Sequence, residues 1–324
     1  MSESSALPPR VTADIGGTHT RLALYDPGRS EFRWQTTLEN QRYASLEAAL
    51  EDWIAQLPEP LPRHACLAVA ALIRDDQVSM TNRNWSFSRA ALARRFNFDR
   101  LRVINDFEAH AHALPWLTKE DLLMLQPGLP TADAAGRERL AVIGPGTGLG
   151  GAILESGREG RHAVSCEPGH MNLAPGTPEL LALWPELMQE HGRVHVELLL
   201  SGAGLARLHS ALHRRATGSG ANLSPADITR RATDGTDPLC RETVELFCSL
   251  LGDVCADFVL ATGAWGGLFL AGGILPRVAC LLQSSRFLGR FTDRGPLGTA
   301  LSQLPINLIL HPRPGLVGTA HAPL

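Results

Sequence analysis

Lysine is almost absent from this sequence of 324 residues: of its 30 Lys and Arg residues, only Lys119 is a lysine. P-loop enzymes and protein kinases each hold phosphate groups with a lysine in a fixed sequence context. Lys119 lies in the segment Leu117–Asp121, and no glycine-rich loop precedes it. If the chain binds a polyphosphate, it must therefore do so with backbone N–H groups, hydroxyls and a metal ion.

Basic excess and long apolar runs are absent too. The formal net charge is -3, which does not suggest nucleic-acid binding. No apolar run reaches the ~18 residues that span a bilayer, and the short polar segment Met1–Arg10 does not resemble a signal peptide. With 44% hydrophobic and 19% charged residues, the composition is that of an ordinary globular protein. We expect a soluble cytoplasmic protein that binds neither nucleic acid nor membrane.

Cysteine is present but scattered. No pair has the C-x-x-C spacing of a metal or redox motif. The pattern predicts buried, reduced thiols rather than a zinc site or a disulfide framework, and it applies to Cys66, Cys166, Cys240, Cys248, Cys255 and Cys280.

The hydrophobic pattern predicts mixed strands and helices. Val11–Asp14 and Arg21–Tyr25 form one expected hairpin, and Leu140–Ile143 and Ala152–Leu154 form a second with the same plan. The two hairpins are roughly 130 residues apart, an interval that suits a duplicated domain. Helices are expected at Leu46–Leu57, Arg89–Phe96, Glu179–Gln189, Val196–Ala216, Ala226–Thr233, Cys240–Leu260 and Leu275–Leu288, and further strands at Cys66–Ile73, Leu101–Ile104 and Gly266–Ala271.

The first hairpin turn combines a carboxylate with accessible backbone amides. Asp14 ends a strand, Gly16 and Gly17 let an anion approach the main chain, and Thr18 adds a hydroxyl. The carboxylate can hold Mg²⁺ through water. A plain Gly-Gly hairpin turn explains the same residues, so this turn alone leaves both interpretations open.

The second turn, Gly144–Gly151, favours phosphate binding more strongly. It contains five glycines in eight residues, more than a two-residue hairpin requires, with Thr147 at its centre. Two Gly/Thr turns facing each other would hold a polyphosphate without lysine. A bulged hairpin is the alternative.

Asn105 and Asp106 follow an expected strand. A capping box with Glu108 three residues after Asn105 is the better explanation on local sequence. The functional interpretation makes Asp106 a base that takes a proton from an attacking hydroxyl.

The segment Glu167–His170 carries a carboxylate and an imidazole, and its Pro-Gly pair forbids a regular helix. Glu197 adds a second carboxylate further along the chain. Such groups suit the paired hydroxyls of a sugar. A metal site of Glu167, His170 and Glu197 is less favoured, because no second His or Cys has ligand spacing. A solvated loop remains open as well.

Small residues recur at Gly266–Gly267 and Ala271–Ile274, where a strand is expected to turn into a helix. They leave room for a flat base and a ribose. Helix packing explains them nearly as well.

Together these motifs resemble the bacterial glucokinase family. They occur in that family's order from about residue 11 to 319, and the segment Pro314–Gly318 also matches. The motifs are Ala13–Thr18, Ile104–Phe107, Gly144–Gly150, Glu167–His170, Leu200–Leu205 and Ala271–Arg277.

The resemblance implies an α/β, two-domain actin-like ATPase (ribonuclease H-like) fold with an interdomain cleft. It implies transfer of the ATP γ-phosphoryl group to the 6-hydroxyl of glucose, with Mg²⁺, in a homodimer. Asp106 would be the base, and the sugar would bind to Asn105, Asp106, Glu167, His170 and Glu197. Mg²⁺ (through water on Asp14) and the nucleotide would be held by Asp14, Ile15, Gly16, Gly17, Thr18, Gly146, Thr147, Gly148, Gly202, Gly204, Gly272 and Gly273.

The expected small domain comprises residues 1–115 and 306–324, and the large domain residues 116–305. The chain departs from the family pattern in two places: His19 stands where asparagine is usual, and the proline that is frequent near Ala71 is missing. Two alternatives follow, a kinase for another hexose such as mannose or glucosamine, and a sugar sensor without catalysis. Related sugar kinases and repressors carry a cysteine-rich zinc motif after Glu-x-Gly-His, but Met171–Pro175 has no cysteine.

Overall fold

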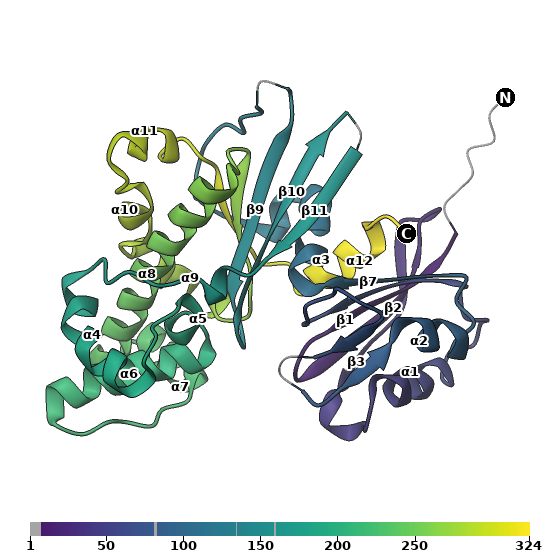
Figure 1. Cartoon of the computed structure of the whole chain (residues 1–324), viewed down its shortest axis with the longest axis horizontal. Coiled ribbons are helices and arrows are strands. Elements are labelled where there is room, and N and C mark those ends of the chain that lie inside the picture. The colour runs from purple at the N-terminus through teal and green to yellow at the C-terminus, as the bar shows by residue number, and fades with distance from the viewer. Residues whose placement is uncertain (1–7, 81–82, 134, 159) are drawn as a thin grey trace. The chain divides into compact units, whose positions relative to one another are not determined.

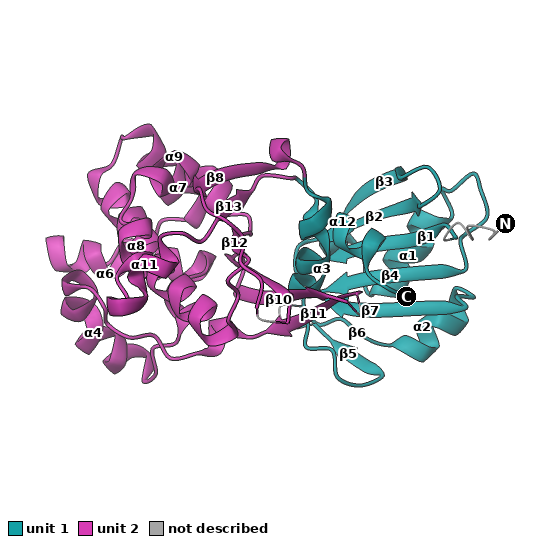
Figure 2. Cartoon of the chain, turned by 90° about the horizontal axis from the view of Figure 1, so that it is seen from above, with its two compact units in different colours: residues 1–117, 312–324 teal, residues 118–311 magenta. Residues whose placement is uncertain are grey.

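The computed structural model describes residues 8–80, 83–133, 135–158 and 160–324, so only residues 8–10 of the segment Met1–Arg10 are described. The chain divides into two compact units (Figure 2): unit 1 comprises Met1–Leu117 and Pro312–Leu324, and unit 2 comprises Thr118–His311. Unit 2 is thus formed by one continuous segment, and unit 1 by the two segments that precede and follow it in the sequence. Strand β13 (Ile306–Ile309) pairs with two strands of unit 2, so residues 306–311 lie there and not in the small domain in which we expected them.

Unit 1 contains a five-stranded sheet in the order β3-β2-β1-β4-β7. β1 pairs antiparallel with β2, whereas β1, β4 and β7 are parallel to one another. Their bounds are β1 Arg10–Ile15, β2 His19–Asp26, β3 Glu31–Glu39, β4 His64–Val69 and β7 Arg100–Asn105, and β5 (Gln77–Ser79) and β6 (Ser86–Ser88) form a small separate sheet.

Helices cover both faces of this sheet (Figure 1), namely α1 (Leu46–Ile54) and α2 (Arg89–Arg95) on one and α3 (Asp106–Ala113) and α12 (Pro314–His321) on the other. Side chains of a strand alternate between faces. In β4, Leu67 accordingly packs in the core that includes α1, whereas Cys66 and Ala68 pack with Ala109 of α3. The centre of the sheet is therefore buried on both sides.

Unit 2 is built on a six-stranded sheet in the order β11-β10-β9-β12-β13-β8. β9, β12 and β13 are parallel, and the remaining neighbours pair antiparallel. The bounds are β8 Leu122–Gln126, β9 Glu138–Pro145, β10 Leu149–Gly157, β11 Gly160–Cys166 and β12 Gly267–Leu270.

Most of the helical mass of unit 2 surrounds α8, whose side chains Phe247, Leu250 and Cys255 are fully or almost fully buried. No helix in the described ranges is both long enough and apolar enough to span a membrane. The helices are α4 Pro178–His191, α5 Val196–Leu199, α6 Gly202–Thr217, α7 Pro225–Asp234, α8 Pro238–Thr262, α9 Ala279–Ser284, α10 Phe287–Thr292 and α11 Gly298–Leu301.

Two helices that we predicted as continuous are interrupted. The first, Val196–Ala216, is broken between α5 and α6, where the Ser201 hydroxyl accepts the N–H of Gly204 at 3.0 Å and so caps α6. A Cβ atom on Gly204 would overlap the carbonyl of Leu199, so glycine permits the sharp junction. The second, Leu275–Leu288, is divided into a 3-10 turn, α9 and the start of α10.

Candidate active site

The first glycine turn lies between β1 and β2 and is held from outside by Asn40. The Gly16 N–H donates to the His19 carbonyl at 3.0 Å and closes the turn. The Asn40 side chain donates to the Gly16 carbonyl at 2.8 Å, and its backbone N–H donates to the Thr18 carbonyl at 2.9 Å. Because Asn40 is fully buried and also accepts from the Thr20 hydroxyl at 2.8 Å, this polar cluster fixes the turn.

Asp14 places one charge beside this turn. Its side chain is 12% exposed and pairs with Arg21, with 3.1 Å between Nη1 and Oδ2. A Cβ on Gly315 of α12 would lie 2.7 Å from the Asp14 Cγ, so only glycine lets α12 pack this closely against the carboxylate. Burial lowers the pKa of His110 of α3, while the Asp14 charge raises it and the Arg21 charge lowers it further.

Asn105 and Asp106 lie at the same edge of the sheet as this turn. The parallel register aligns Ile15 with Val69, and Val69 with Asn105. The cap expected at Asn105 is confirmed, since its Oδ1 accepts the N–H groups of Phe107 at 2.9 Å and Glu108 at 3.4 Å. The Glu108 carboxylate accepts from Arg102 at 2.8 Å.

Asp106 is the first residue of α3, and its carboxylate accepts the N–H of Phe107 at 3.0 Å. The positive end of the helix dipole favours an ionised carboxylate there. The fold thus places a half-buried carboxylate next to the Asn105 cap, where it can accept a proton from a bound hydroxyl.

At both positions that depart from the family pattern, the backbone carbonyl accepts a hydrogen bond. The His19 carbonyl closes the first turn, and its side chain is exposed. The Ala71 carbonyl accepts from the Asn105 side-chain amide at 3.1 Å. Neither of these two hydrogen bonds involves the side chain of His19 or Ala71.

The second glycine turn joins β9 and β10 in unit 2. The Gly146 N–H donates to the Gly148 carbonyl at 2.7 Å, and the Gly202 N–H at the start of α6 donates to the Gly146 carbonyl at 2.9 Å. Glu197 supports it by accepting the Leu149 N–H at 2.8 Å. The turn is therefore held by α5 and α6, while Thr147 at its tip is exposed.

The predicted glycines of unit 2 differ in what surrounds them. A Cβ on Gly148 would overlap the Glu197 carboxylate, and one on Gly272, which has a φ of +93°, would overlap the Pro145 carbonyl. A Cβ on Gly146 or Gly273 would have nothing within 4 Å. Packing alone therefore accounts for Gly148 and Gly272, and Gly146 and Gly273 are the positions that leave space for a ligand.

The turn after β12 lies beside the turn after β9, since the two strands are parallel and the Ala271 N–H donates to the Ile143 carbonyl at 2.9 Å. The same edge of the unit 2 sheet thus carries Gly144–Gly148 and Ala271–Gly273. In unit 1, the turn after β1 and the residues after β7 share a sheet edge in the same way.

The segment Glu167–His170 leads into a short 3-10 helix, Pro168–His170, and packs on Glu197. A Cβ on Gly169 would lie 3.2 Å from the Glu197 Cβ. Glu167 and His170 are exposed, and Glu197 is half-buried. In the part of the chain that the structure describes, these three residues do not form a group with metal-ligand spacing.

Sequence reasoning missed three residues around Asp14 and its turn: Arg21, Asn40 and Gly315. Arg21 lies in a recognised strand, but the pairing depends on the antiparallel register that puts it opposite Asp14. Gly315 lies in the matching segment Pro314–Gly318, which was the available signal. Asn40 has no local signal, since its contacts reach 20 or more residues along the chain.

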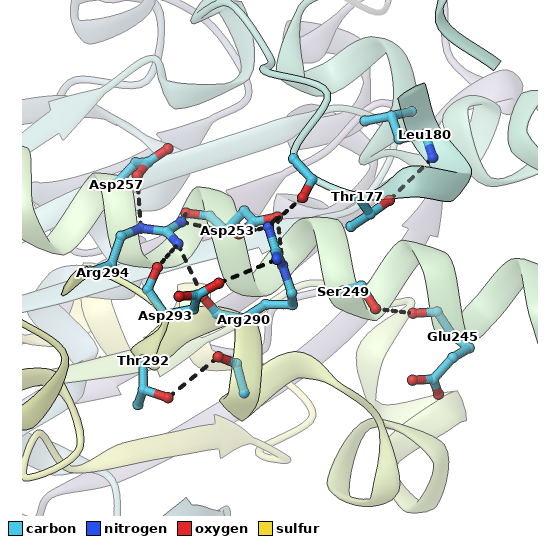
Figure 3. Close-up of polar contacts among 12 residues, drawn as sticks. Thr177, Leu180, Glu245, Ser249, Asp253, Asp257, Arg290, Thr292, Asp293 and Arg294 are labelled. Carbon is cyan, nitrogen blue, oxygen red and sulfur yellow. Dashed lines mark hydrogen bonds and ion pairs between the residues drawn. The ribbon is translucent and has the colours of Figure 1, made fainter. Parts of the chain in front are cut away.

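A cavity of about 290 Å³ lies elsewhere in unit 2, between the segment Met171–Gly176 and helices α8 and α10. Figure 3 shows its charged side chains bound to one another, with Asp253 2.9 Å from an Arg290 nitrogen and 3.1 Å from an Arg294 nitrogen. Arg290 also donates to the Gly176 carbonyl at 2.8 Å. This network fastens α10 to α8, and we do not include the cavity in the candidate active site.

Comparison with known proteins agrees with these features. The glucokinase family model matches residues 11–323. A glucokinase of Chromobacterium violaceum is 40% identical over 321 residues, covering 98% of this chain and 90% of that protein. A glucokinase of Nitrobacter hamburgensis is 41% identical over 318 residues, 97% of each.

A solved glucokinase from an Antarctic psychrotroph superimposes with a TM-score of 0.83 at 37% identity, covering 97% of this chain and 98% of that one. This likeness confirms the expected α/β fold of the actin-like type, and the family match confirms the resemblance predicted from the motifs. The chain belongs to the glucokinase family.

Proposed function

We propose that this chain is a glucokinase, which transfers the γ-phosphoryl group of ATP to the 6-hydroxyl of glucose and yields glucose 6-phosphate and ADP. The observation that carries the proposal is the match over residues 11–323, together with curated glucokinases that align over 90% or more of their own length.

Asp106 would act as the base for the 6-hydroxyl. Its position beside the Asn105 cap supports this role, because the cap fixes the start of α3 and hence the carboxylate. Asn105, Glu167, His170 and Glu197 would hold sugar hydroxyls. Glu197 has one oxygen committed to the Leu149 N–H, so the other is left for the sugar.

The two glycine turns would hold the nucleotide phosphates with main-chain N–H groups and the hydroxyls of Thr18 and Thr147. The open space at Gly146 and Gly273 supports placing ligand atoms there. Gly202, Gly204, Gly272 and Gly273 would lie near the nucleoside. Of these four, Gly273 is the one whose added Cβ would have nothing within 4 Å.

Asp14 would hold Mg²⁺ through water. The residues fit such an ion, because a carboxylate is the hard oxygen ligand that Mg²⁺ prefers and the Asp14 side chain is 12% exposed beside the first turn. When bound, Mg²⁺ neutralises charge on the β- and γ-phosphates. The homodimer and the cytoplasmic location remain predictions.

The proposal is tested by measuring ADP release from ATP with glucose, mannose and glucosamine in turn. Glucose-dependent turnover with the highest kcat/KM for glucose is the expected result. A higher kcat/KM for mannose or glucosamine would identify that hexose as the substrate. Sugar binding without ADP release would identify a sensor.

The role of Asp106 has its own test. Asp106→Asn should lower kcat by about 10²-fold or more, because it removes the base while keeping the shape of the side chain. Glucose binding, measured by calorimetry, should persist in this variant. A near-normal kcat would exclude Asp106 as the base.

A further inference from the structure

A cluster outside the candidate active site joins three residues whose side chains bind metals. His209 lies on α6, Asp237 is the N-cap residue of α8, and Cys240 lies in the first turn of α8. One ligand atom from each lies within 4.8 Å of the others, and among the described residues theirs is the group with this property. The cluster lies wholly within unit 2.

His209 is the unusual member. His209 is only 2% exposed. Neither its Nδ1 nor its Nε2 has a hydrogen-bond partner among the described residues. Buried polar groups in folded proteins nearly always have a partner. An imidazole nitrogen that has no hydrogen-bond partner is available to bind a metal ion.

The ligand types favour zinc over the harder cations. A thiolate and an imidazole are soft or borderline ligands that suit Zn²⁺, whereas Mg²⁺ takes oxygen ligands. Ligand atoms around one tetrahedral zinc lie roughly 3.3–3.8 Å apart, given bond lengths of about 2.0–2.3 Å. Side chains within 4.8 Å of one another reach this spacing by small rotations.

Charge and support in the cluster also suit zinc. A thiolate and a carboxylate together cancel the charge of Zn²⁺, which avoids an uncompensated buried charge. Asp237 is held in place, since its Oδ1 accepts the N–H groups of Leu239 at 3.0 Å and Cys240 at 3.2 Å. Arg231 lies 3.7 Å from the other oxygen and is the cation with which the metal would compete.

We propose that His209, Asp237 and Cys240 bind one Zn²⁺, with a water molecule as the fourth ligand. Binding replaces the proton of the Cys240 thiol with a zinc–sulfur bond and releases that proton to solvent.

The site would connect α6 to α8. Helix α6 begins at Gly202, whose N–H binds the Gly146 carbonyl of the second glycine turn. Zinc would therefore stabilise the packing behind that turn without taking part in phosphoryl transfer.

The experiment uses the full chain with Cys280→Ser as background, because Cys280 is an exposed thiol that would bind metal non-specifically. Zinc affinity is measured by competition with a chromophoric chelator, and Co²⁺ is substituted to detect thiolate-to-metal charge transfer. We expect about one zinc per chain and a higher Tm with zinc than after chelation.

Cys240→Ser should abolish the cobalt–thiolate absorption, and His209→Gln should weaken zinc binding at least about tenfold. Cys248→Ser is the matched control, a buried cysteine of the same helix about 12 Å further along its axis; it should bind zinc normally. Absence of zinc binding at micromolar free zinc in the background protein would overturn the proposal, without depending on any variant of the ligands. Unchanged binding in Cys240→Ser would also overturn it.

Discussion

The two glycine turns share a backbone plan and differ in what holds them. Each joins two antiparallel strands, and each lies at the edge where parallel strands of its sheet end. The first turn is held by the buried amide of Asn40 and lies beside the Asp14–Arg21 ion pair. The second is held by Glu197 and by the start of α6.

Under the proposed function, this difference would divide the work of binding a polyphosphate without lysine. Both turns would offer main-chain groups to the phosphates, but the first adds a carboxylate that would serve a cation, and the second adds open space at Gly146. A repeated backbone shape therefore does not imply an identical role.

The largest effect should come from the charge at the first turn. Asp14→Asn should lower kcat/KM for ATP by about 10²–10³-fold, as expected when a group that organises charge in the transition state is removed. Steady-state kinetics over a range of Mg²⁺ concentrations measures it. Arg21→Met, which removes the ion pair and keeps the carboxylate, should lose far less. Equal losses in the two variants would show that the ion pair, and not a Mg²⁺ site, is what matters.

The next prediction distinguishes two glycines of the second turn, one that leaves space for a ligand and one that packing requires. Gly146→Ala should raise KM for ATP about tenfold, equivalent to about 1.4 kcal/mol, and leave Tm unchanged, because its methyl group enters open space. Gly148→Ala should instead lower Tm, because its methyl group displaces the Glu197 carboxylate. Thermal melts and ATP titrations of both variants check this, and a low Tm for Gly146→Ala would contradict it.

An effect of comparable size, on stability and not on activity, concerns the support of the first turn. Asn40→Ala should reduce the free energy of unfolding by about 1–3 kcal/mol, since buried partners of the amide are left unpaired. Glu197→Gln is the counterpart at the second turn and should cost less, because an amide oxygen can still accept the Leu149 N–H. Urea denaturation measures both, and a larger loss for Glu197→Gln would reverse the comparison.

The smallest effect is the pH dependence beside the first turn. Because burial lowers the pKa of His110 in the folded state, the unfolded chain takes up a proton below about pH 6.5 while the folded chain does not. Stability should therefore fall as pH drops from about 6.5 toward the folded pKa. His110→Gln should reduce this loss between about pH 7 and 5, by at most about 1.4 kcal/mol per pH unit. Parallel Tm curves for the parent and the variant would show that His110 does not contribute.

Local sequence was enough to predict the two hairpins and their turns, because glycine content and strand alternation are short-range signals. It was not enough at the α5–α6 junction, where the break depends on Ser201 capping Gly204 and on the contact of Gly204 with Leu199. Strand β3 was missed because most of its side chains are exposed or half-buried, which leaves no clear hydrophobic alternation.

The candidate site was predicted residue by residue from motifs, yet the motifs did not distinguish glycines needed for packing from those that leave space. Gly148 and Gly146 look alike in sequence, and only the position of Glu197 separates them. The role of Asn40 could not be predicted from local sequence for a related reason: the pairing of β2 with β3 brings its partners to it.

The return of the chain to unit 1 has a consequence for biosynthesis. Helix α12 packs on α3, β1 and β4, and the Arg10 guanidinium donates to the Ala322 carbonyl at 2.8 Å. A ribosome therefore releases the strands of the first sheet and α3, whose Ala109 packs with Cys66 and Ala68, long before α12 and Ala322, which complete this face. During that interval the face of the nascent sheet is covered only in part, while unit 2, made from one uninterrupted stretch, can complete its own core first.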